Sequence, residues 1–251
     1  MDRAALRRLQ RDKGDTAGIW IATPHPGHVD GHYHDSVVNT LLYDAHNGQR
    51  IVKWGCVCTM ETSPRIASAR NDMVEEFLKT NLAIPPEWLL FIDSDMRWSA
   101  DDFELFASTL ENEPDIKILG GLCFGGGRGS KAFPTLYILT DAKDTTLDRA
   151  EDYPDNEIVK VSATGAAFVA IHRDVLLDMK QAYGEVDGKK NTMIWFRDGT
   201  SDGKEYGEDI WFCLTAMGAG YDTFVHTGVK IGHMKRFDLN EAHYQENRTD
   251  G

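Results

Sequence analysis

Short apolar runs alternate with amphipathic segments along most of the chain, and this alternation limits its fold more than any other feature. Such a pattern is typical of a layered α/β domain, in which helices cover a sheet of buried strands. The apolar runs predict strands over residues 18–23, 51–59, 88–92, 116–123, 135–139, 158–162, 166–171 and 221–225. Since the 251 residues contain no repeat and no linker-like change of composition, we expect one domain over 1–251.

Charge and hydropathy exclude several classes of protein. The chain has 27 Lys and Arg residues against 40 Asp and Glu residues, a formal net charge of −13, which disfavours a surface built to hold duplex DNA. No run approaches the roughly 18 apolar residues of a membrane span, and the N-terminus lacks the apolar core of a secretory signal. We therefore expect a cytoplasmic protein without a transmembrane anchor. Its core should cover about 18–235, between a basic helix over 1–15 and a polar tail over 236–251.

Capping residues indicate two helix starts. Ser63 followed by Pro64 is typical of an N-cap with proline in the first turn. Ser99 and Asp102 have the spacing of a capping box. The buried stripe expected after this second start is Phe103, Phe106 and Leu110.

Arg70 is unusual within the first of these helices. Arg70 follows Ile66 by four residues, so the two side chains are only about 40° apart around the helix axis. Arg70 therefore lies on the apolar stripe of the helix. A buried arginine needs an anionic partner, because an unpaired buried charge is strongly unfavourable. The alternative is that the side chain extends to the rim and reaches water.

Two carboxylates follow the most apolar strand directly. The run 88–92 leads into Asp93-Ser94-Asp95, at the carboxyl end of a strand, where open α/β sheets bind ligands. Neighbouring carboxylates repel each other unless a cation lies beside them, and a hard divalent ion keeps positions for water and phosphate oxygens. The alternative is a turn of Asp and Ser that only ends the strand.

Further acidic and imidazole groups come later in the chain. Glu208 and Asp209 occupy the first turn of a helix that ends at Gly218 or Gly220, and His233 follows the next strand. The helix dipole explains carboxylates in a first turn, but not their recurrence with a DxD and a later histidine. A neutral histidine can complete a divalent site made mostly of oxygens. We expect the inward face of this helix to consist of Ile210, Leu214 and Met217.

Taken in order, these segments resemble a known family. The set consists of Ala69-Arg70-Asn71, FIDSD at 91–95, TGAAFVAIHRDVL at 164–176, GED at 207–209 and GH at 232–233. It is similar to the nucleotide-sugar-dependent glycosyltransferases of the GT-A fold, family 2 type, over roughly residues 18–235. The resemblance implies a single Rossmann-like GT-A domain with a mostly parallel central sheet flanked by helices. The histidine-rich segment 19–36 and the short C-terminal region depart from the family pattern.

The resemblance also implies roles for individual residues. Asp95 and His233 would bind Mn²⁺ or Mg²⁺, with Asp93 facing the metal, its water or the ribose. Asp209 would be the general base of an inverting transfer, with Glu208 beside it. The residues expected to contact the nucleotide are Thr23, Pro24, Arg70, Asp72, Asp93 and Ser94.

The chemistry of sugar transfer agrees with these residue types. A metal stabilises the charge that develops on the leaving diphosphate, and a carboxylate takes the proton of the attacking hydroxyl. The expected donor is a UDP-sugar, or else a GDP-sugar, in a hexosyltransferase-like reaction. The acceptor is a glycan, a protein or a modified nucleic acid, in a cytoplasmic enzyme of bacterial or phage type.

Three alternatives belong to other classes. A zinc metallohydrolase would use His25, His28, His32 and His34 with Asp35. His32 and His34 would lie on one face of a strand, but Asp35 follows His34 directly and does not match the H-x-H-x-D-H pattern. A sugar nucleotidyltransferase would have a glycine-rich loop with a basic residue after its first strand, which ATPHPGH lacks. A noncatalytic binding module would have no need of this set of acidic residues.

Two glycine-rich segments are candidates for mobile connections. GGLCFGGGRGSK at 120–131 is not a phosphate loop, because its lysine follows the serine; we expect a flexible connection in which Arg128 or Lys131 can contact phosphate. DGTSDGKEYG at 198–207 precedes the acidic helix, and it is either a lid or an ordinary surface loop.

Overall fold

The computed structural model describes residues 18–51, 57–62, 65–80, 85–127, 131–140, 146–187, 190–201 and 203–235. The predicted basic helix over 1–15 and the predicted polar tail over 236–251 lie outside these residues, as do Ser63 and Pro64.

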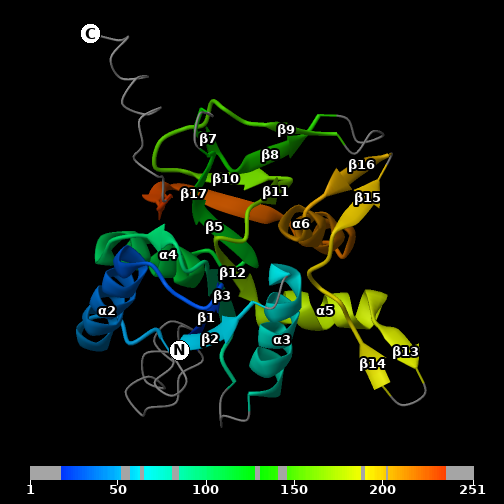
Figure 1. The fold of residues 1–251 in the computed structure, drawn as a ribbon, viewed down its shortest axis with the longest axis horizontal. Helices are drawn as coiled ribbons and strands as arrows, with labels where there is room; N and C mark the ends of the chain where they lie inside the picture. The colour runs from blue at the N-terminus through cyan, green and yellow to red at the C-terminus, as the bar shows by residue number, and fades with distance from the viewer. Residues whose placement is uncertain are drawn as a thin grey trace.

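A seven-stranded sheet forms the centre of the domain, in the order β10-β17-β5-β12-β3-β1-β2 (Figure 1). The strands are β1 (Ile19–His25), β2 (Val57–Glu61), β3 (Trp88–Ile92), β5 (Ile118–Leu122), β10 (Ile158–Val161), β12 (Phe168–His172) and β17 (Thr223–Lys230). Five of them run in one direction, and β12 and β10 run against them. The predicted α/β fold with a mostly parallel sheet is confirmed. Every residue of β3 and β5 is buried, as expected of strands that are covered on both faces.

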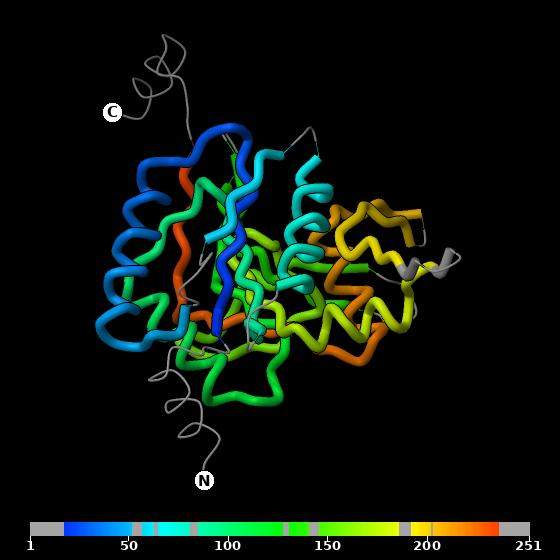
Figure 2. The backbone as a smooth tube through the Cα atoms, turned by 90° about the horizontal axis from the view of Figure 1, so that it is seen from below, coloured from blue at the N-terminus to red at the C-terminus, as the bar shows by residue number. Residues whose placement is uncertain are grey.

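In the part of the chain that the structure describes, five helices cover the two faces of the sheet. They are α2 (Gly31–His46), α3 (Ile66–Lys79), α4 (Ala100–Asn112), α5 (Arg173–Tyr183) and α6 (Glu208–Gly218). Figure 1 shows α2 and α4 on one side of the sheet and α3, α5 and α6 on the other, and Figure 2 shows the same division from below. None of the described helices is long and apolar enough to cross a membrane.

Alternation along the strands supplies a core to each face. In β3, Leu89 and Phe91 point to the side of α3 and α5, whereas Leu90 and Ile92 point to the side of α2 and α4. Both layers are closed by large side chains from the helices, such as Phe77 on one side and Phe106 on the other.

Smaller strands extend the domain beyond the main sheet. They pair as β4 (Met96–Arg97) with β18 (Gly232–His233), β6 (Phe124–Gly125) with β7 (Phe133–Pro134), β8 (Leu136–Leu139) with β9 (Leu147–Arg149) and β11 (Ala163–Thr164), β13 (Glu185–Asp187) with β14 (Lys190–Thr192), and β15 (Gly199–Ser201) with β16 (Lys204–Tyr206). The segment 198–207 is therefore mostly a hairpin, with Asp202 outside the described residues.

The helix starts were predicted with mixed success. The capping box of α4 is confirmed: Asp102 N donates to Ser99 Oγ at 3.1 Å, and Ser99 N donates to Asp102 Oδ2 at 2.9 Å. Its stripe of Phe103, Phe106 and Leu110 is buried as predicted. The start at Ser63-Pro64 is wrong, because α3 begins at Ile66 after Arg65 as its N-cap.

The predicted inward face of α6 is right for Ile210, which packs against the core, and wrong for Leu214 and Met217, which line a surface cavity. The buried residues of α6 are Phe212, Cys213 and Ala216, while Met217 is 39% exposed. The segment IWFCLTAMG is apolar on nearly every side, so its sequence pattern does not select one face. Packing against β11 selects it instead, where Cys213 Sγ lies 3.7 Å from Thr164 O.

Part of the connection predicted over 120–131 is a buried strand. Gly120 and Gly121 belong to β5, and a Cβ at Gly121 would lie 2.9 Å from Ile231 Cγ1 and 3.1 Å from Phe168 Cδ1. Glycine here serves close packing rather than flexibility. Arg128 lies outside the described residues, and Lys131 is exposed.

Candidate functional site

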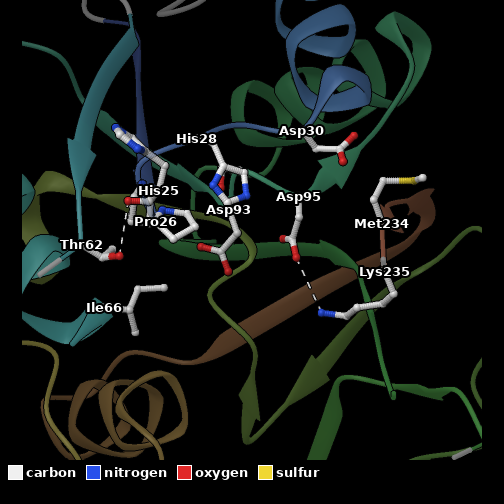
Figure 3. Close-up of a pocket in the computed structure, with 12 residues that line it drawn as sticks. His25, Pro26, His28, Asp30, Thr62, Ile66, Asp93, Asp95, Met234 and Lys235 are labelled. Atoms are coloured by element: carbon white, nitrogen blue, oxygen red, sulfur yellow. Dashed lines mark hydrogen bonds and ion pairs between the residues drawn. The ribbon is translucent and has the colours of Figure 1, made fainter. Parts of the chain in front are cut away.

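A cavity of ≈ 380 Å³ opens at the edge of the sheet where β1 and β3 end (Figure 3). Ligands bind at this edge of open α/β sheets, because the loops after the strands leave a crevice there. The cavity wall combines four segments of the chain: Pro24, His25, Pro26, His28, Asp30, Thr62, Ile66, Asp93, Ser94, Asp95, Met234 and Lys235. The predicted DxD sequence therefore shares one cavity with the residues that end the first strand.

The turn that carries the DxD is held against the segment that carries His233. β4 follows the turn directly and pairs with β18, so that His233 is opposite Met96. Met234 N also donates to Asp95 O at 2.8 Å. As a result, His233 Nε2 lies 3.0 Å from Asp95 Oδ2. The two predicted metal ligands, which are far apart in the sequence, are in contact.

The surroundings of His233 favour one arrangement of its ring. Its Nδ1 lies 2.9 Å from Phe124 O, and because a carbonyl only accepts, Nδ1 carries the proton. Nε2 is thus the nitrogen directed at Asp95, and a carbonyl behind the other nitrogen is typical of histidines that bind metals. The hydrogen bond with Asp95 raises the pKa of His233. Burial alone would raise the pKa of Asp95, but His233 and Lys235 outweigh it and hold that pKa below its usual value.

Arg70 lies behind the DxD and joins it to α6. The residue is 2% exposed. Its Nη2 donates to Asp93 Oδ1 at 2.8 Å, and its Nη1 donates to Glu208 Oε1 at 2.5 Å. The predicted anionic partner of a buried Arg70 is confirmed, and extension to the rim is wrong. Burial raises the pKa of Asp93, and the negative charges of Asp95 and Asp209 raise it further, whereas Arg70 opposes this shift.

The acidic pair at the start of α6 is divided between two environments. Glu208 forms the ion pair with Arg70, and burial raises the pKa of its carboxyl although Arg70 opposes the shift. Asp209 is partly buried, and its Oδ2 lies 3.6 Å from the position that a Cβ would take on Gly165. Its charge acts on both Arg70 and Asp93. Asp209 therefore belongs electrostatically to the same cluster as the DxD.

Of the residues predicted to contact a nucleotide, Pro24, Asp93 and Ser94 line the cavity. Thr23 is fully buried and its hydroxyl bonds to that of Tyr33. Asp72 is exposed on α3. The structure thus does not bring Thr23 or Asp72 to the cavity wall, and it places Arg70 one layer behind.

Several residues of the cavity wall were not predicted to contact a nucleotide. His25 ends β1 and His28 lies three residues later; both were predicted only as part of the zinc alternative, although the rule that ligands bind at strand ends also identifies them. Lys235 lies two residues after His233, and its Nζ is 3.6 Å from Asp95 Oδ2. Thr62 and Ile66 were not predicted at the site, because the sequence around them indicates only the start of a helix.

The zinc alternative is wrong in its geometry. His32 and His34 lie on α2, not on a strand, and both are exposed. Residues two apart on a helix point about 200° from each other, so these two imidazoles cannot share an ion. Among the described residues, no group of three or more His, Cys, Asp or Glu side chains could hold a metal ion by itself. A metal at Asp95 and His233 would need further ligands from water or a bound substrate.

A second cavity of ≈ 480 Å³ lies between the outer side of α6, the end of α5 and the hairpin of β13 and β14. Leu214, Met217 and Ile194 line it, together with Trp211, which stacks on Tyr206. It contains none of the predicted catalytic, nucleotide or metal residues. Size alone therefore does not identify the site.

The fold and the site together define a class of structure, an α/β domain of the GT-A type with a DxD at the end of β3 and an acidic helix start beside it. Solved structures with a similar fold include the following two. A197 from STIV is 14% identical, over 87% of this chain and 86% of that chain, with a TM-score of 0.52. GalNAc-T7, solved with UDP, GalNAc and Mn²⁺, is 11% identical, over 88% of this chain, with a TM-score of 0.53. The match covers 44% of the GalNAc-T7 chain.

These comparisons confirm the predicted GT-A fold. At such low identities they establish the fold and not the activity. No family model matches the chain, and no curated protein matches its sequence.

Proposed function

We propose that the protein is a metal-dependent glycosyltransferase that moves a sugar from a nucleoside-diphosphate sugar to an acceptor hydroxyl with inversion. One observation carries the proposal. Asp95, the second carboxylate of the DxD, lies 3.0 Å from the Nε2 of a histidine whose other nitrogen is fixed by a backbone carbonyl. Asp95 lines the cavity at the ligand-binding edge of a GT-A fold, and His233 contacts it there.

The donor atoms fit Mn²⁺ or Mg²⁺. Asp95 would supply a carboxylate oxygen and His233 a neutral imidazole nitrogen, and these ions accept such ligands while keeping positions for phosphate oxygens. When bound, the metal would neutralise charge on the leaving diphosphate. The GalNAc-T7 structure, solved with UDP and Mn²⁺, supports UDP and manganese as the first pair to test.

Asp209 is the proposed general base. It begins α6 beside Glu208, and the ion pair of Glu208 with Arg70 ties this helix start to Asp93. A carboxylate placed there can orient an acceptor hydroxyl and accept its proton, while the diphosphate leaves on the side of Asp95. Attack opposite the leaving group inverts the anomeric carbon. Glu208, already paired with Arg70, would position the base.

Thermal-shift measurements test the donor site. UDP and GDP should raise the melting temperature of the wild type, and Mn²⁺ should enlarge the shift. Asp95→Ala should lose the manganese-dependent part. Asp148→Asn, an exposed residue on β9, is the matched control and should behave as the wild type. Stabilisation by Zn²⁺ alone, with no effect of any nucleotide, would contradict the proposal.

Turnover assays test the base. Asp209→Asn should keep the nucleotide-induced shift and lose at least about 100-fold in transfer or donor hydrolysis. Glycans, peptides and modified nucleic acids serve as the panel of acceptors. Transfer by Asp209→Asn at the wild-type rate would remove Asp209 from this role. Release of pyrophosphate from UTP and a sugar 1-phosphate would instead indicate a nucleotidyltransferase.

A further inference from the structure

Lys235 is a cation at the edge of the cavity to which the proposed function assigns no task. Its side chain is half-exposed and lines the cavity, and Nζ lies 3.6 Å from Asp95 Oδ2 (Figure 3). Among the described residues of the cavity wall, it is the single Lys or Arg side chain.

The backbone fixes where Lys235 begins. The pairing of β18 with β4 and the hydrogen bond from Met234 N to Asp95 O hold the preceding residues against the DxD turn. His233 adds a contact from its Nδ1 to Phe124 O. The chain therefore delivers a flexible side chain, with a terminal ammonium group, to the same point as the carboxylate of Asp95.

The contact between Lys235 and Asp95 is weak. At 3.6 Å the two groups are an ion pair without a hydrogen bond, and the two side chains are 50% and 41% exposed. Exposed pairs of this kind contribute little, so the ammonium can leave Asp95 at small cost. Asp95 also keeps its stronger contact with His233 when Lys235 moves.

The charges of the cavity indicate what Lys235 would bind. Asp30, Asp93 and Asp95 line it, and Arg70 balances Asp93 from behind. A diphosphate entering beside these carboxylates needs a positive group on its own side, and an ammonium supplies a compact charge with three rotatable donors.

We propose that Lys235 binds the diphosphate of the nucleotide and stabilises it as the leaving group. This inference rests on the proposed function, because it assumes a nucleoside-diphosphate donor in this cavity. Lys235 would hold phosphate oxygens that a nucleoside monophosphate lacks. It therefore contributes to the preference for a diphosphate over a monophosphate.

The test is the ratio of affinities for UDP and UMP, measured by calorimetry with Mn²⁺ present. Lys235→Met should weaken UDP binding about tenfold and UMP binding less than about twofold, because a charge-assisted contact is lost only with the diphosphate. Lys235→Arg should keep most of the ratio. Raising the KCl concentration should weaken UDP binding more in the wild type than in Lys235→Met.

Lys230→Met is the matched control. Lys230 pairs with the exposed Asp155 at 2.8 Å and does not line the cavity, so its loss should leave both affinities unchanged. If Lys235→Met folds poorly, Lys235→Gln gives the same comparison.

The outcomes separate the two proposals. An unchanged ratio in Lys235→Met, with normal UDP binding by the wild type, would overturn the role of Lys235 and leave the transferase intact. The same measurement is made with GDP and GMP. If the wild type binds neither UDP nor GDP, the proposed donor site itself is overturned.

Discussion

Arg50 and Arg70 each bind two carboxylates, but Arg50 lies at the amino ends of the parallel strands and Arg70 at their carboxyl ends. Arg50 binds Glu104 and Glu111, and its carbonyl accepts a hydrogen bond from Ile19 N at the start of β1. Arg70 binds Asp93 and Glu208 at the end where β3 stops.

The partners of the two arginines differ in origin. Glu104 and Glu111 both come from α4, so Arg50 fastens one segment to one helix. Asp93 and Glu208 come from a strand end and from a distant helix start, and Asp93 continues into the cavity wall. An arginine that holds two carboxylates is therefore not in itself a sign of function. We propose that position relative to the carboxyl ends of the strands distinguishes Arg70, whose partner Asp93 lines the cavity, from Arg50.

The largest effect should come from Arg70→Met. The change leaves Asp93 and Glu208 beside each other without a cation, and loss of one partner from a buried pair costs about 3–5 kcal/mol. Urea unfolding should show a loss of this size, and the nucleotide-induced thermal shift should disappear. Arg70→Lys, which keeps the charge but not the two-sided contact, should be milder. A loss under about 1 kcal/mol with normal nucleotide binding would show that the two arginines are equivalent.

Arg50→Met should have a smaller effect of a different kind. The carboxylates that it abandons are 33% and 27% exposed and can reach water, so we expect a loss of about 1–2 kcal/mol in the free energy of unfolding. Nucleotide binding and turnover should stay at the wild-type level in the folded protein. A fall in UDP affinity in Arg50→Met would show that residues at the amino ends of the strands contribute to the site.

The smallest effect should come from Glu208→Gln. Glutamine keeps an oxygen that accepts from Arg70 Nη1 and loses only the charge, which is worth about 1 kcal/mol. Transfer activity should fall by a few-fold at most, in contrast to Asp209→Asn. Equal loss of turnover in both variants would show that the two neighbouring carboxylates act as one unit.

Much of the fold could be read from the sequence because its signals are local. The buried run before Asp93 predicted β3 to the residue, and the capping box predicted α4. The contact of Asp95 with His233 could be expected only by resemblance, because it depends on the pairing of β4 with β18. Arg70 places a charged side chain on the apolar face of a helix. Because an unpaired buried charge is strongly unfavourable, this position predicts an anionic partner.

The rest depended on packing that a pattern cannot encode. α6 is apolar on nearly all sides, so β11 decides which face is buried. α2 was not predicted at all, because its segment begins with glycine and contains three histidines, and the cap that Asp30 provides to His32 N gives no clear sequence pattern. The position of Lys235 follows from backbone contacts of the preceding residue with the DxD turn.

The reversed direction of β12 has one more consequence. Because this strand enters the sheet where its neighbours leave it, the small residues before it cross the rim between the DxD and α6, and Ala167 O accepts a hydrogen bond from Asp93 N at 2.9 Å. Gly165 consequently lies beside Asp209, because a Cβ on this residue would come 3.6 Å from Asp209 Oδ2. A larger side chain at position 165 would therefore press against the carboxylate that we propose as the base.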